Sequence, residues 1–142
     1  MKKILFKIKN NAIIVKEKVK LSTNNKNLLN TNVISADELL FSLEYLISNL
    51  KIVSTFINEI TSNYNIDTLV IEKNEFVLPI LDIVRNNKNI KNLILNEDNQ
   101  LTFKICESVT KTSIKNLNCY NLQPFMIEFL DKHGIIVESR NE

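Results

Sequence analysis

Ile66-Asp67-Thr68-Leu69-Val70-Ile71 is the stretch that decides the fold, because its pattern returns as Ile90-Lys91-Asn92-Leu93-Ile94-Leu95 and as Ile114-Lys115-Asn116-Leu117-Asn118-Cys119. The three stretches start 24 residues apart and alternate like β-strands. Helices are expected after them, over residues 78–86, 100–110 and 124–133, with Gly134 ending the last helix before a strand at 135–137. Strands joined by helical crossovers run parallel. The sequence therefore predicts an α/β fold in which three to four βα units form a mainly parallel sheet, as a 24-residue repeat or a small open sheet.

Two further segments precede these units. Residues 1–34 predict a β-hairpin that turns at Asn10-Asn11, with Ile4, Phe6, Ile8, Ile13, Val15, Val19 and Leu21 on one face, and then a polar loop over residues 22–32. Residues 35–64 predict a helical segment that starts at the capping box Ser35-Ala36-Asp37-Glu38. Two helices divided near Asn49 are favoured over a single long helix, because Ser48-Asn49 is a weak breaker. With the βα units of residues 65–142 they form a single domain, 1–142, expected to be the N-terminal part of a longer protein.

The helical segment carries an apolar stripe from Leu39 to Ile60, which Leu40, Ile47 and Phe56 widen. A stripe this wide favours packing on the sheet. The alternative is a seam between two copies of the chain, so a homodimer stays possible.

The pattern Ile66-x-x-Leu69-x-Ile71-x-x-Asn74-x-Phe76 resembles the leucine-rich repeat, in which spaced leucines fill a solenoid and an Asn closes the turn. Later units carry Asp98 and Leu122 at the Asn position. The resemblance covers about half of the chain and implies a one-directional βα array. Arrays of that family usually serve as binding surfaces for other proteins, and the resemblance implies the same use here.

Composition excludes several classes of protein. Hydrophobic residues make up 44% and charged residues 24%, and no apolar run approaches the roughly 18 residues of a membrane span. The N-terminus lacks the apolar centre of a signal peptide, so a cytoplasmic location is expected. A single glycine, Gly134, cannot build a phosphate-binding loop. Cys106, Cys119 and His133 fit no metal-ligand spacing, so no metal or cofactor is expected and structural roles are favoured for all three.

Alternation in the repeated strands directs Leu69, Ile71, Leu93, Leu95, Leu117 and Cys119 toward the helices. The opposite face becomes more polar from strand to strand, and its candidate interaction residues are Asn92, Asn96, Asn116, Asn118 and Tyr120. This face either hydrogen-bonds a ligand or partner peptide, or is covered by the helices of residues 36–63 with Val70 and Ile94 in the core. The covered arrangement is favoured, since polar residues at the rim of a core need no ligand.

Two other candidate sites follow from position and charge. The carboxyl ends of parallel strands commonly bind ligands, and the candidates there are Glu72, Lys73, Asn74, Glu97, Asp98 and Asn121. Residues 1–26 hold eight Lys and one Glu, a local charge of +7, and this basic face comprises Lys7, Lys9, Lys16, Lys18 and Lys20. Residues 1–26 contain no arginine, and no aromatic residue there is expected to stack on bases. These two features argue against nucleic acid as the partner. Lysines on exposed strands also prevent aggregation, which is the favoured interpretation.

No catalytic constellation is visible, so the sequence favours a non-catalytic interaction or scaffold domain over an enzyme. Its partner would be another protein or further domains of the same chain. The first alternative is an enzyme or small-ligand-binding domain that uses the strand ends. The second is a basic adaptor for an anionic partner.

Overall fold

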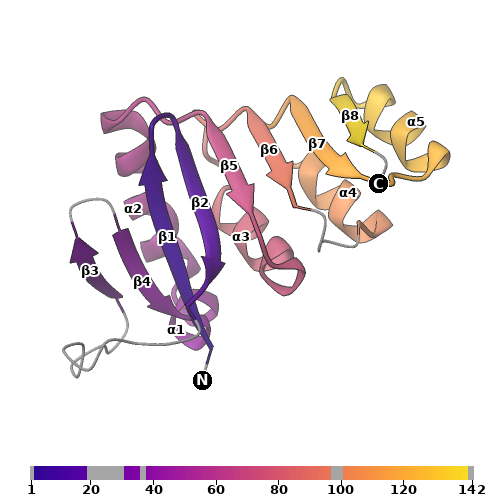
Figure 1. The fold of residues 1–142 in the computed structure, drawn as a ribbon. Coiled ribbons are helices and arrows are strands. Elements are labelled where there is room, and N and C mark those ends of the chain that lie inside the picture. Colours follow the sequence, from indigo (N-terminus) through magenta and orange to yellow (C-terminus); the bar gives the residue numbers. More distant parts are fainter. Residues whose placement is uncertain (1, 19–30, 36–37, 97–100, 141–142) are drawn as a thin grey trace.

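The computed structural model describes residues 2–18, 31–35, 38–96 and 101–140 (Figure 1). These residues form one sheet of eight strands in the order β3-β4-β1-β2-β5-β6-β7-β8. Strands β2, β5, β6, β7 and β8 run parallel to one another, and β3, β4 and β1 add an antiparallel part in which β1 pairs with β2. The predicted α/β class and its mainly parallel sheet are confirmed. No helix among the described residues combines the length and apolarity that crossing a membrane requires.

The N-terminal hairpin is confirmed. β1 (Lys3–Lys9) pairs antiparallel with β2 (Ala12–Glu17), and Asn10 makes the turn at φ +56°, a conformation that Asn tolerates. Ile4, Phe6, Ile13 and Val15 are buried in the core. The predicted inward positions Val19 and Leu21 lie outside the described residues.

The helix predicted to begin at Ser35 begins later, and the structure corrects this point. Glu38–Ser42 forms strand β4, which pairs with β1 on one side and with β3 (Thr31–Ser35) on the other. Its Leu39-Leu40-Phe41 run is buried throughout, and a short apolar run suits a central strand as well as a helix turn. Ala36 and Asp37 of the proposed capping box, and most of the predicted loop over residues 22–32, lie outside the described residues.

Two helices follow β4, as predicted. α1 (Leu43–Ser48) begins where the Ser42 hydroxyl accepts a hydrogen bond from the Tyr45 N–H at 3.1 Å, and α2 (Leu50–Asn63) begins after a break at Asn49. Leu46, Val53 and Ile57 are in the core. Ile47 and Phe56, which the sequence assigned to the same stripe, are instead 52% and 40% exposed, so the stripe is narrower than predicted.

The three quoted stretches are strands β5 (Thr68–Ile71), β6 (Asn92–Leu95) and β7 (Asn116–Tyr120), and the last strand is β8 (Ile136–Arg140). Their crossovers contain the short 3-10 helix η1 (Asn74–Phe76) with α3 (Val77–Ile83), then α4 (Phe103–Thr110), then α5 (Pro124–Lys132). Residues 24 apart are neighbours from β5 to β6 and from β6 to β7. Gly134 takes φ +76° after α5, as its place at the helix end predicts.

All the described helices cover the same face of the sheet, which corrects the prediction for residues 36–63 (Figure 1). α2 contacts α3, α3 contacts α4, and α4 contacts α5, so the four helices form one layer. The reason is that β2 and β5 are parallel neighbours, so the segment that joins them is itself a crossover, and a right-handed crossover places α2 beside α3. Val70 and Ile94 are half-buried and lie outside the main core cluster.

A buried amide joins α2 to the loop before β6. Asn87 is 1% exposed. Its Nδ2 donates to Asn58 Oδ1 at 2.8 Å and to Thr61 Oγ1 at 3.0 Å. Its Oδ1 accepts from the backbone N–H groups of Asn89 and Ile90 at 2.8 and 3.0 Å. The amide is therefore fully hydrogen-bonded and fixes the helix layer to the sheet.

Candidate functional site

The side of the sheet that faces away from the helices, here called the helix-free face, carries rows of side chains that run across the strands. The rows arise because neighbouring strands are in register, so outward-facing residues stand side by side. The amide row contains Lys9, Ala12, Thr68, Asn92, Asn116 and Ile136. The middle row contains Lys7, Ile14, Val70, Ile94, Asn118 and Glu138. An end row continues the alternation at the carboxyl ends of the strands with Glu72, Asn96, Tyr120 and Arg140.

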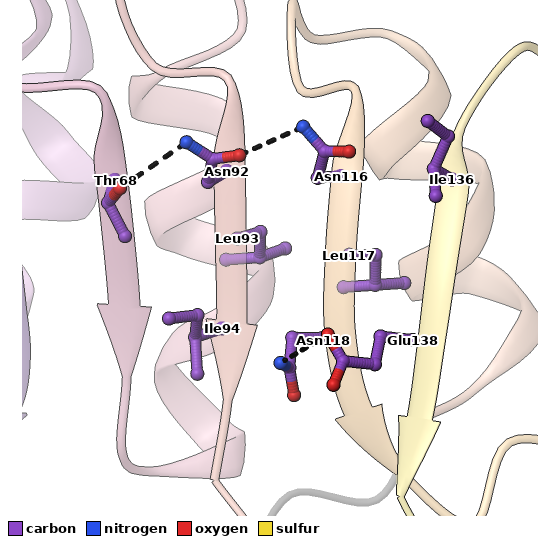
Figure 2. A pocket seen from close by; sticks show the side chains of 9 residues that line it. All are labelled: Thr68, Asn92, Leu93, Ile94, Asn116, Leu117, Asn118, Ile136 and Glu138. Carbon is purple, nitrogen blue, oxygen red and sulfur yellow. Dashed lines mark hydrogen bonds between the residues drawn. The ribbon is translucent and has the colours of Figure 1, made fainter.

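In the amide row, side chains are hydrogen-bonded from strand to strand (Figure 2). Asn116 Nδ2 donates to Asn92 Oδ1 at 2.9 Å, and Asn92 Nδ2 lies 3.4 Å from both Thr68 Oγ1 and the Asp67 carbonyl oxygen. Each amide is thereby oriented by its neighbour. Asn116 is the exposed end of this chain of bonds, and an amide offers both donors and an acceptor to a ligand.

In the middle row, the side chains change from apolar to polar. Asn118 Nδ2 donates to Glu138 Oε2 at 3.3 Å. Among the described residues, Asn118 Oδ1 is one of two buried side-chain polar atoms without a hydrogen-bond partner; the other is Arg140 Nε. Turning the amide over would place Oδ1 against the Glu138 carboxylate, acceptor against acceptor, so the unpaired atom has to be the oxygen.

These two rows enclose a hollow of about 270 Å³ on strands β5 to β8 (Figure 2). It is lined by Thr68, Asn92, Leu93, Ile94, Asn116, Leu117, Asn118, Ile136 and Glu138. Its volume lies just below the roughly 300–1,000 Å³ of most small-molecule sites. A hollow of this size with apolar walls and several hydrogen-bonding groups suits one side chain of a partner or a small polar ligand.

In the end row, Arg140 lies over the face of Tyr120, with its guanidinium carbon 4.0 Å from the ring centroid. Its Nη2 donates to the Leu95 carbonyl oxygen at 3.3 Å. The side chain therefore reaches from β8 to the end of β6 and fixes Tyr120 beneath it.

The predicted interaction residues Asn92, Asn96, Asn116, Asn118 and Tyr120 come together on the helix-free face of β6 and β7, with Asn96 and Tyr120 outside the hollow. Their binding role stays a prediction. Sequence reasoning missed Thr68, Ile136 and Glu138 in the hollow. The available signal for Ile136 and Glu138 was the alternation of the last strand, which brings every second residue to this face.

The predicted strand-end residues are partly engaged in ion pairs. Lys73 Nζ lies 2.7 Å from Glu17 Oε1 and 3.9 Å from Glu75 Oε1, and Lys2 pairs with Glu75. The hydrogen bond from Lys73 lowers the pKa of Glu17 from its ordinary value of 4.5, while burial acts in the opposite direction.

Other members of this set lie apart from those pairs. Glu72 is half-buried after β5, and Asn74 begins η1. Asn121 has φ +51° and donates its backbone N–H to the Arg140 carbonyl oxygen. Glu97 and Asp98 lie outside the described residues.

The predicted basic residues share the helix-free face. Ile4, Phe6, Ile13 and Val15 point into the helix-side core, so the residues between them point the other way. This alternation places Lys7 and Lys9 of β1, with Lys16 and Lys18 of β2 and its extension, on the helix-free face. Lys20 lies outside the described residues.

Cys106 and Cys119 are free and buried, and burial raises the pKa of each thiol to about 11. A neutral, buried thiol is a poor nucleophile and a poor metal ligand. His133 ends α5, and its Nδ1 lies 2.9 Å from the Phe129 carbonyl oxygen. Over the described ranges, no three or more His, Cys, Asp or Glu side chains are grouped to hold a metal ion.

Comparison of this chain with protein-family models, curated proteins and solved structures gives no match.

Proposed function

We propose that the domain is a non-catalytic interaction module that binds a partner protein, or a further domain of its own chain, on the helix-free face. The observation that carries the proposal is that the described helices all cover one side of a sheet whose β5–β8 part is parallel. Parallel sheets almost always have both faces covered. A partner on the second face would complete the layering that this kind of sheet requires.

The chemistry of the face supports a protein partner. Half-buried Val70 and Ile94 provide apolar area beside the hydrogen-bonding groups of Asn92, Asn116 and Asn118. Interfaces combine an apolar centre with polar groups that fix orientation. Tyr120, fixed under Arg140, adds an aromatic contact of the type enriched at binding hot spots.

Binding of a partner to the helix-free face can be tested by photo-cross-linking. The photoreactive residue p-benzoylphenylalanine is placed at Ile94 on the helix-free face, and at exposed Glu107 of α4 as the matched control on the opposite side. The full chain is then irradiated in an extract of its own cells. A discrete adduct is expected from position 94, absent from position 107 and lost when Asn118→Arg is added. Adducts of equal yield from both positions, or none from position 94, would contradict the proposal.

A basic adaptor is the second candidate, favoured by the placement of Lys7, Lys9, Lys16 and Lys18 on this same face. It predicts binding of heparin as a model polyanion, with an affinity that falls steeply as salt rises and is lost in the Lys7→Ala, Lys16→Ala, Lys18→Ala triple variant. Affinity that is unchanged between low and high salt would exclude this candidate.

A further inference from the structure

The middle row of the helix-free face changes character along its length. Lys7 stands at the β1 end, Ile14, Val70 and Ile94 follow on β2, β5 and β6, and Asn118 and Glu138 stand on β7 and β8. The row is thus cationic at one end, apolar in the middle and anionic at the other end. A ligand that matches the whole row needs a negative charge at the Lys7 end and a positive charge at the Glu138 end.

The Glu138 end is rich in hydrogen-bond acceptors. The buried Asn118 Oδ1 lacks a partner, and Asn118 Nδ2 occupies Glu138 Oε2. Ile94 stands beside Asn118 in the middle row and Ile136 stands beside Asn116 in the amide row, and both are apolar walls of the hollow (Figure 2). The protein's own Arg140 stands in the end row, held against Tyr120 and the Leu95 carbonyl oxygen. A guanidinium suits this hollow, because its flat face packs on apolar walls while its N–H groups bind the exposed Glu138 carboxylate.

The opposite end of the face is basic in more than one row. Lys7 lies in the middle row and Lys9 lies in the amide row. Lys16 of β2 stands beside Leu5 of β1. Several lysines together attract carboxylates over a longer range than one exposed ion pair does.

We infer that the helix-free face holds an extended peptide segment of its partner, which crosses the strands with an arginine in the hollow at Glu138 and acidic residues over Lys7. This inference rests on the proposed function. An extended chain is favoured over a helix because the amide row lies alongside the middle row. Its Asn92 and Asn116 side chains offer hydrogen-bonding groups to the free N–H and C=O groups of an extended backbone. A helix already uses its own backbone N–H and C=O groups in internal hydrogen bonds.

The register sets the spacing that the segment must have. Glu138 and Lys7 are separated by five strand steps, β8-β7-β6-β5-β2-β1. At about 4.8 Å per step the row is roughly 24 Å long, and an extended chain that rises about 3.3 Å per residue covers it in about seven residues. A helix, which rises 1.5 Å per residue, would need about 16.

The test uses synthetic peptides with one arginine followed by a Ser/Ala spacer and two glutamates, the first placed about three, seven or 16 residues after the arginine. Binding to the ¹⁵N-labelled full chain is followed by NMR. The seven-residue peptide is expected to bind most tightly and to shift the side-chain amide signals of Asn116 and Asn118. Citrulline, the neutral analogue of arginine, should weaken binding about five- to tenfold.

Glu138→Gln should abolish the preference for arginine over citrulline, and Glu107→Gln on α4 is the matched control that should keep it. Both residues are exposed, so both variants should fold, which their NMR spectra check. Equal binding of arginine and citrulline peptides overturns the arginine anchor. Tightest binding by the 16-residue spacing overturns the extended conformation. If position 94 still cross-links to a partner in either case, the proposed function stands and only this inference fails. The absence of any cross-link from position 94 would refute the proposed function, and with it this inference.

Discussion

Replacing Asn87 by Ala should destabilise the fold far more than its position in a short loop indicates. The substitution removes two hydrogen bonds donated to Asn58 and Thr61 and two accepted from backbone N–H groups, one of them the buried N–H of Ile90. A hydrogen bond contributes about 1 kcal/mol net, and a buried donor left unpaired costs about 1–3 kcal/mol. Some of the freed groups are only partly buried and can reach water. We therefore expect the free energy of unfolding to fall by about 3 kcal/mol.

Urea unfolding followed by circular dichroism measures this loss. With a slope of about 2 kcal/mol per M for a domain of this size, the midpoint should fall by about 1.5 M without a change in slope. Exposed Asn86 is the matched control, and Asn86→Ala should change stability by less than about 0.5 kcal/mol. A loss below about 1 kcal/mol for Asn87→Ala would refute the reasoning, because it would mean that α2 is fixed to the sheet without this amide.

Three further outcomes follow from local geometry. Ser42→Ala removes the hydroxyl that caps α1 and should cost about 1 kcal/mol in thermal unfolding; no loss would exclude the cap. Lys73→Ala should raise the pKa of Glu17 toward 4.5 in an NMR titration, since the hydrogen bond that lowers it is gone, and an unchanged pKa would assign the shift to another group. Folded Cys106 and Cys119 have a pKa of about 11 against an ordinary 9.0, so they favour the folded state fully below pH 9 and lose that contribution as pH rises through 11. Unfolding midpoints measured between pH 8 and 11 should therefore decline less in a variant with both thiols replaced by Ala; an equal decline would attribute the effect to other groups.

Much of the parallel sheet was predictable, because each strand repeats the same inward apolar positions. Leu69, Leu93 and Leu117 stand side by side in the structure, and the 24-residue spacing already indicated this. β4 was not predictable, since three consecutive apolar residues, Leu39-Leu40-Phe41, satisfy a strand and a helix equally well. The strand is selected by its pairing with β3 and with β1, which is far away in the sequence.

The polar residues of the helix-free face were predicted from the sequence, but the sequence favoured their being covered by the helices of residues 36–63. Whether α2 covers it depends on β2 being the parallel neighbour of β5, and a hairpin pattern alone does not reveal which strand its second member joins. Glu138 was missed for a related reason, since its value to the site comes from standing beside Asn118 and not from any local motif. Residues that join a candidate site only because their strands are paired can be recognised only when the strand pairing is known.

The in-register pairing of residues 24 apart has a consequence for how such a domain can change over time. Duplicating one unit would lengthen every row by one strand step, about 4.8 Å, while the existing neighbours keep their contacts. Within a unit, alternate strand positions face either the helix-side core or the helix-free face. Substitutions on the helix-free face can therefore accumulate while the core positions keep the packing that the fold requires.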